Sequence, residues 1–153
     1  MTLATRLQSV NAIAERVVGW LASPLLLVTR GYVAWQFLKS GWLKATDWET
    51  TRFLFEEEYH VPLVPPVVAA LGGTFGELVF PVLLILGLLT RYAAAGLFVV
   101  NVVAVVSYSH VLLGEGFEAA LGQHYLWGYL LLVVFVFGPG RLAVDGLMRV
   151  RRP

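Results

Sequence analysis

The chain has 153 residues, of which 58% are hydrophobic and only 14% are charged. A soluble domain carries roughly 25% charged residues, so this chain is too apolar to cover a surface that faces water. Its net charge of +1 excludes a strong basic field for nucleic acid. Its lack of cysteine excludes disulfides, thiolate metal sites, iron–sulfur ligation and a cysteine nucleophile. We therefore expect an all-α integral membrane protein that lies in the lipid bilayer and binds no nucleic acid.

The first 23 residues have the spacing of an amphipathic helix. Apolar side chains recur at helical intervals from Leu3 to Leu21, and polar side chains fall largely between them. A signal peptide is the competing interpretation, but Glu15 and Arg16 interrupt the apolar core that such a peptide needs. The pattern favours a helix over residues 1–23 that lies in the membrane interface.

Four apolar stretches are long enough to cross a bilayer, which takes roughly 20 helical residues. They cover about 24–43, 66–89, 92–111 and 117–137. The short turn between the second and third stretches makes these two helices antiparallel, and Gly138-Pro139-Gly140 ends the fourth. The sequence therefore predicts one membrane domain over residues 1–153, a bundle of four transmembrane helices.

The distribution of charge predicts the orientation of this bundle. Basic residues concentrate in the N-terminal segment, in the turn between the second and third spans and in the tail over residues 138–153: Arg6, Arg16, Arg91, Arg141, Arg149, Arg151 and Arg152. The other two loops are mainly acidic. Because basic loops stay in the cytoplasm, both termini should be cytoplasmic. Residues 44–65 then form an outer loop, which we expect to fold as a short helix over the mouth of the bundle, as a lid or a docking surface.

Polar side chains within the spans are the candidates for a site. A charge at the bilayer centre costs on the order of 3 kcal/mol in an inserted helix, so it usually faces protein or water. Arg30 and Lys44 lie about 40° apart around the first helix and so share a face. We expect Arg30 to face the bundle interior with Glu77 as its counter-charge, directly or through water or Asn101.

The surroundings of Glu77 in the sequence are consistent with a site. Gly72 and Gly76 have the spacing that lets helices approach closely in membranes. Pro81 follows one turn after Glu77 and can free a backbone carbonyl. A structural ion pair that only fixes helix register would bury the same residues, and the sequence leaves both interpretations open.

The histidines suggest a second kind of site. His110 and His124 come from adjacent spans, and together with Glu77 they are candidates for a metal or proton-relay site. No element carries two ligands at metal-binding spacing, which weakens the metal interpretation. His60 lies in the outer loop with no partner at a characteristic spacing, so we expect it to be only solvated.

Three stretches together resemble the DoxX family of small bacterial membrane proteins: VTRGYVAWQFLKSGWLKATDWETTRFLFEEEYHVPLVPP, GELVFPVLLILGLLTRYAA and HYLWGYLLLVVFVFGPGRLAVD. The resemblance runs in order over about residues 25–145. Its motifs fall on Arg30, on Gly41 with Lys44, on Glu77, on Arg91 and on Gly138 through Asp145. Trp35 departs from the pattern, because a small residue is common at that place.

The resemblance implies a four-helix protein of the bacterial inner membrane that is linked to respiratory or redox processes. Our leading hypothesis is an accessory subunit that holds a quinone or another lipophilic ligand in the outer half of the bundle. It would be a non-catalytic partner of an oxidoreductase more than an enzyme itself. Arg30 and Glu77 would set the polarity there, and His110 or His124 would bond a quinone carbonyl. The cofactor stays unknown, and a homo-oligomer stays open.

Two alternatives stay open beside it. One is a metal-handling or export component associated with small metal-binding peptides, which would use His110, His124, Glu77 and the acidic outer loop. The absence of cysteine and the presence of only two methionines argue against copper transport. The other is a structural membrane anchor for a partner enzyme, in which the buried charges only lock the bundle.

Overall fold

The computed structural model describes residues 3–150, and it describes the side chains of Gln8 and of residues 10–148. The side chains of Arg6, Arg149, Arg151 and Arg152, which contributed to the predicted orientation, lie outside this part. The described residues form helices and no strand: α1 Leu3–Thr46, α2 Trp48–Glu57, α3 Pro66–Leu86, α4 Thr90–Ser107, α5 Ser109–Leu112, α6 Glu118–Phe137 and α7 Val144–Val150. Four of them, α1, α3, α4 and α6, are long and apolar enough to cross a membrane. The prediction of an all-α membrane bundle is confirmed.

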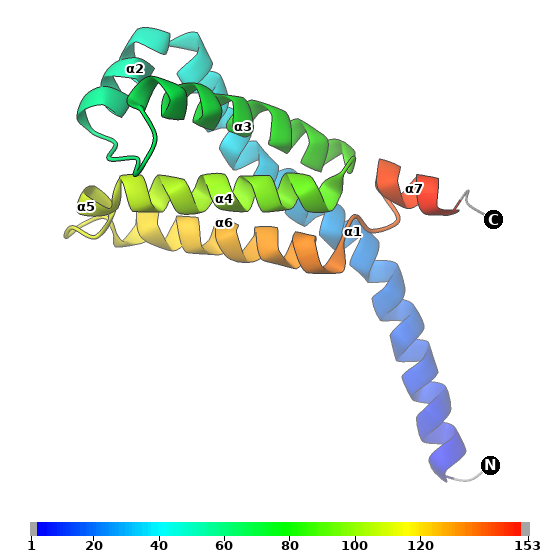
Figure 1. The fold of residues 1–153 in the computed structure, drawn as a ribbon. Coiled ribbons are helices and arrows are strands. Elements are labelled where there is room, and N and C mark those ends of the chain that lie inside the picture. Colours follow the sequence, from blue (N-terminus) through cyan, green and yellow to red (C-terminus); the bar gives the residue numbers. More distant parts are fainter. Residues whose placement is uncertain (1–2, 151–153) are drawn as a thin grey trace.

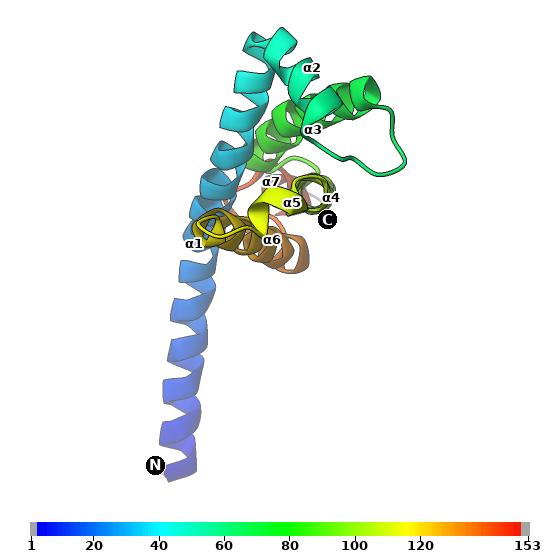
Figure 2. The same cartoon turned by 90° about the vertical axis from the view of Figure 1, so that its left-hand side faces the viewer.

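Helix α1 differs from the prediction in one respect. The expected interfacial helix over residues 1–23 is not a separate element, because α1 continues through Pro24 without a break. Side chains 10–22 are exposed, and this half of α1 projects away from the bundle (Figures 1 and 2). Its apolar stretch Val10–Thr46 has 37 residues and would measure about 55 Å at 1.5 Å per residue, against a hydrocarbon core of about 30 Å. Part of α1 therefore extends beyond the hydrocarbon, and its location in the interface stays a prediction.

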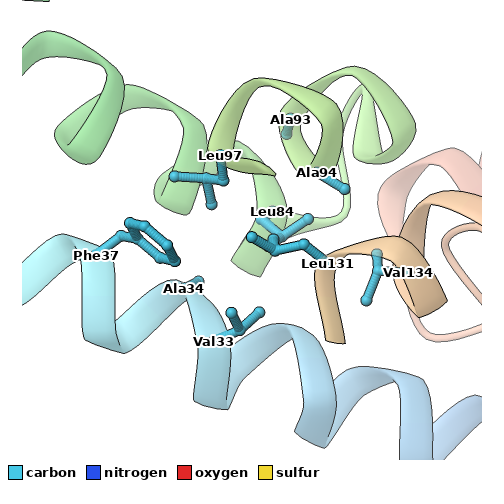
Figure 3. Close-up of a cluster of buried hydrophobic side chains, with 9 residues drawn as sticks. All are labelled: Val33, Ala34, Phe37, Leu84, Ala93, Ala94, Leu97, Leu131 and Val134. Carbon is cyan, nitrogen blue, oxygen red and sulfur yellow. The ribbon is translucent and has the colours of Figure 1, made fainter. Parts of the chain in front are cut away.

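The remaining long helices pack around the second half of α1. Helix α3 lies against α1 on one side and α4 on the other, and α4 packs against α6 (Figure 1). Figure 3 shows the core where α1, α3, α4 and α6 meet. This core consists of fully or almost fully buried apolar side chains: Val33, Ala34, Phe37, Leu84, Ala93, Ala94, Leu97, Leu131 and Val134. Several of them are small, which lets the helices approach closely in the absence of a hydrophobic driving force.

The two ends of the bundle are closed by different short elements. At one end, the α2 end, Asp47 caps α2 by accepting a hydrogen bond from the Thr50 N–H at 3.2 Å. Helix α2 packs on α3 through Phe55, Ala69 and Ala70. At the opposite end, the α7 end, the turn from α3 to α4 contacts α7. The structure thus places a short helix within the loop 44–65, whereas its role as a lid stays a prediction.

Candidate functional site

An ion pair with little solvent exposure joins α1 to α3 near the α2 end. The Lys44 Nζ atom lies 2.6 Å from both carboxylate oxygens of Glu77. The Glu77 side chain is 7% exposed and the Lys44 side chain 19%. The prediction that Arg30 is the counter-charge of Glu77 is wrong. Arg30 and Lys44 do lie on similar faces of α1, but Lys44 is the one at the depth of the carboxylate.

Gly41 is the reason that Lys44 reaches Glu77. A Cβ atom built on Gly41 would lie 2.8 Å from both the carbonyl carbon and the Cβ of Glu77, so the backbones of α1 and α3 are in direct contact there. Lys44 follows Gly41 by three residues and therefore projects from nearly the same face of the helix. The spacing of glycine and lysine thus combines a close approach with a cation beside the buried carboxylate.

Further hydrogen bonds hold the lysine and attach α2 to it. The Lys44 ammonium also donates to Ser40 Oγ at 3.0 Å. The Lys44 carbonyl oxygen accepts a bond from Thr51 Oγ1, on α2, at 3.0 Å. A lysine held on several sides loses less freedom when it contacts a ligand, so the pair is partly preorganised for binding.

The ion pair borders a cavity of about 360 Å³ between α3, α4 and the segment that contains α2. The lining is mainly apolar and includes small residues of α3, valines of α4 and the chain after α2: Lys44, Phe55, Tyr59, Val61, Val64, Val68, Ala69, Gly72, Gly73, Glu77, Val99, Val100, Val103, Ala104 and Ser107. Lys44 and Glu77 are the charged members of this lining. An apolar cavity with a few convergent polar groups is the usual form of a small-molecule site.

A second cavity of about 210 Å³ shares Lys44, Phe55 and Tyr59 with the first. Its other lining residues are more polar, with Ser40, Asp47, Thr50 and Thr51 beside Leu43 and Leu54. Burial raises the pKa of the Tyr59 phenol, and the neighbouring Tyr108, Glu77 and Glu58 raise it further. Tyr59 is therefore a neutral hydroxyl at neutral pH, able to donate a hydrogen bond at the boundary between the cavities.

Arg30 lies in a different place, at the α7 end, and is 0% exposed. Its guanidinium donates to the Leu142 carbonyl at 2.6 Å and to the Leu84 carbonyl at 3.4 Å. A side chain on Gly87, whose φ is +70°, would collide with the guanidinium. These contacts join α1, the end of α3 and the chain before α7, so Arg30 stabilises the fold here and is remote from Glu77.

Asp145 completes this cluster at the α7 end. Its carboxylate accepts bonds from the Leu89 N–H at 3.1 Å, and from the N–H and hydroxyl of Thr90, both at 2.8 Å. Its own N–H donates to the Gly87 carbonyl at 2.9 Å. Asp145 therefore caps the N-terminus of α4 from a distant part of the chain, where a negative charge also complements the helix dipole.

Asn101 and His124 form a third polar pair, between α4 and α6. The Asn101 amide nitrogen donates to the His124 carbonyl at 3.0 Å, which leaves its oxygen to face His124 Nδ1 at 2.9 Å. That arrangement makes Nδ1 the protonated ring nitrogen. Both side chains border a surface hollow of about 440 Å³ between α4 and α6. The expected role of Asn101 as a bridge between Arg30 and Glu77 is wrong.

His110 does not meet His124. It lies in α5, beyond the end of the third span, and its Nδ1 atom is 3.4 Å from His60 Nδ1. The candidate pairing of His110 with His124 therefore does not form, and the expectation that His60 is only solvated is wrong. Within the described residues, no group of three His, Cys, Asp or Glu side chains could hold a metal ion, so the candidate combination of His110, His124 and Glu77 does not form.

Comparison with known proteins identifies the family of this chain. The DoxX family profile matches residues 25–110, more than half of the chain. The chain belongs to the DoxX family. An uncharacterized protein of Haemophilus influenzae is similar to it, at 30% identity over 132 residues that cover 81% of this chain and 83% of that protein. No solved structure matches the chain significantly.

The motifs that carried the DoxX resemblance separate into two groups in space. Lys44 and Glu77 form the ion pair at the α2 end, and Gly41 makes the helix contact beside it. Arg30 and Asp145 hold the turn between α3 and α4 at the α7 end. All of these positions were named as motif residues from the sequence. The contact of Gly41 with Glu77 and the cap by Asp145 were not predicted. The spacing of Gly41 and Lys44 was a signal for the helix contact, whereas no local pattern indicated that Asp145 would cap α4.

Proposed function

We propose that this DoxX protein is a membrane subunit that binds a small lipophilic ligand of the quinone class in the cavity beside Lys44 and Glu77. The observation that carries the proposal is an ion pair with little solvent exposure in the wall of a mainly apolar cavity. A bundle that needed only a structural ion pair would have no need to leave about 360 Å³ beside it. This volume lies within the range of about 300–1,000 Å³ found for ligand pockets.

The two charged groups offer complementary contacts to the polar head of such a ligand. The three N–H groups of Lys44 bond to Ser40 and Glu77, and the ammonium can exchange one of these bonds for one to a ring carbonyl. The Glu77 carboxylate can accept a bond from a ring hydroxyl. Tyr59 adds a neutral hydroxyl. When bound, a quinone supplies reversible uptake of two electrons and two protons. The valines of α4 and the glycines of α3 would pack against its ring and the start of its tail.

The setting of this subunit is part of the proposal. A quinone diffuses within the bilayer, and the four apolar helices place the protein there. We place it in the bacterial inner membrane with both termini in the cytoplasm, following its basic N-terminal and C-terminal segments. A partner oxidoreductase would supply the catalytic cofactor and exchange electrons with the bound quinone.

The test is quinone binding by the protein purified in mild detergent, measured with a short-chain quinone and by extraction of any co-purified quinone. Removing one partner of a buried ion pair costs about 3–5 kcal/mol, so Glu77→Gln alone tests folding as well as binding. The double variant Lys44→Met with Glu77→Gln removes both charges and is expected to stay folded. We expect it to weaken quinone binding at least tenfold.

The exposed ion pair on α2 provides the matched control. Arg52 and Glu56 are 3.2 Å apart, and both side chains are largely exposed. The double variant Arg52→Met with Glu56→Gln should bind quinone as the unmodified chain does. Equal affinity of a folded Lys44→Met, Glu77→Gln variant, or no quinone binding by the unmodified chain, would refute the proposal and favour a structural anchor.

A further inference from the structure

Two imidazole rings meet edge to face at the α2 end, outside the ligand cavity. His60 lies in the chain between α2 and α3, and His110 lies in α5. Their ring centroids are 4.7 Å apart and their Nδ1 atoms are 3.4 Å apart. Both residues are exposed.

The separation of the two nitrogens matches the geometry of a metal site. Zinc binds histidine nitrogen at about 2.0–2.1 Å with tetrahedral angles, which places two nitrogen ligands about 3.3–3.4 Å apart. A good hydrogen bond from a ring N–H would be shorter, near 2.9–3.0 Å. The pair therefore has the spacing of two ligands on one ion rather than that of a strong mutual hydrogen bond.

The surrounding residues hold the backbone of His60 and the ring of His110 in place. The His60 N–H donates to the Ser107 carbonyl, at the end of α4, at 2.9 Å. The Tyr108 ring lies against the His110 ring at 5.4 Å and against the Tyr59 ring at 5.2 Å, both edge to face. Rings that are fixed before binding lose little freedom when an ion binds.

The charge of this end of the bundle also favours a cation. The chain from the end of α2 to His60 contains the exposed Glu56, Glu57 and Glu58, and exposed Glu115 and Glu118 follow α5. Arg52 offsets one of these charges through its bond to Glu56. A surface with an excess of carboxylates raises the local concentration of divalent cations.

We propose that His60 and His110 bind a borderline divalent cation such as Zn²⁺ through their Nδ1 atoms. No third side chain of the described residues completes a group of His, Cys, Asp and Glu ligands, so water or a group from another molecule fills the remaining positions. The ion ties the chain after α2 to the junction of α4 and α5. Tyr59, Val61 and Ser107 line the ligand cavity, so this tie fixes one edge of the cavity.

The test is Zn²⁺ titration by calorimetry of protein purified with a tag that contains no histidine. We expect saturable binding that weakens at least tenfold in His60→Gln and in His110→Gln. His124→Gln is the matched control, because His124 bonds to Asn101 within the bundle. The His124→Gln protein should bind Zn²⁺ with unchanged affinity. One ion per two chains would also support the proposal, provided that both substitutions abolish it.

A second measurement needs no substitution. The chain has three histidines, so isotope labelling of histidine gives NMR signals from three imidazoles. Zn²⁺ should shift two of them together and leave the third in place. The absence of saturable Zn²⁺ binding, equal affinity in a folded His60→Gln variant, or a shift of all three or only one signal would overturn the proposal. The outcome does not depend on whether the cavity binds quinone.

Discussion

Replacing Gly41 with alanine should separate α1 from α3 at the ion pair. The new Cβ would lie 2.8 Å from two carbon atoms of Glu77. Nonbonded carbon atoms prefer about 3.5–4.0 Å, so the helices must move apart by about 0.7–1.2 Å. The two atoms closest to the new methyl group belong to the Glu77 backbone and Cβ, which cannot rotate away.

The expected magnitude follows from two opposing effects. Overpacking of this kind costs about 1–3 kcal/mol. Alanine is also the better helix former, by about 1 kcal/mol relative to glycine. Gly31 provides the matched control, because it lies in the same helix and a Cβ there would meet nothing within 4 Å. Gly31→Ala gains the helix preference without the collision, so the two variants should differ by about 1–3 kcal/mol.

The assay is reversible unfolding in mixed micelles of a mild detergent and sodium dodecyl sulfate, followed by circular dichroism. Gly41→Ala should unfold at a lower denaturant fraction than Gly31→Ala. If the proposed function holds, Gly41→Ala should also weaken quinone binding, because Lys44 and Glu77 no longer meet at 2.6 Å. Equal unfolding free energies for the two variants would show that α1 and α3 are not in backbone contact at Glu77.

Two further predictions concern the α7 end and the orientation. Asp145→Ala removes the acceptor of three bonds to Leu89 and Thr90 and should cost about 0.5–2 kcal/mol of unfolding free energy in the same assay. Asp47→Ala removes the cap of a short peripheral helix, so it should cost less unfolding free energy than Asp145→Ala. A larger cost for Asp47→Ala would contradict the structural role of Asp145. Alkaline phosphatase should be active in cells when it is inserted at Leu63 and inactive when it is fused after Pro153, because the enzyme folds only outside the cytoplasm. The opposite pattern would reject cytoplasmic termini.

The transmembrane helices could be predicted from the sequence because the bilayer imposes a simple requirement. A span needs roughly 20 apolar residues, with every backbone polar group bonded within the helix. The described α3 and α6 begin and end within a few residues of the predicted spans. The break expected at Pro24 is absent, because proline is tolerated in membrane helices where the context compensates for the lost bond.

The partners of the polar side chains could not be predicted to the same extent. Helical phase correctly placed Arg30 and Lys44 on similar faces of α1, yet it contains no information on which of them lies level with Glu77. That choice depends on the relative shift of α1 and α3 along their axes, which the contact at Gly41 sets. The partners of His60 and Asp145 could not be predicted either, because each lies far away in the sequence. Nδ1 of His60 lies near Nδ1 of His110, and Asp145 caps α4.

From the sequence it could be predicted that this chain lies in a membrane, that four of its helices are long enough to cross it, and which polar residues must avoid lipid. These properties follow from composition and helical periodicity, which act locally along the chain. The packing of the helices in three dimensions pairs Lys44 with Glu77 beside a cavity and leaves Arg30 to bind backbone carbonyls at the far end of the bundle. The physical reason is that a buried charge takes the partner within reach of its own side chain, and helix packing alone sets that distance.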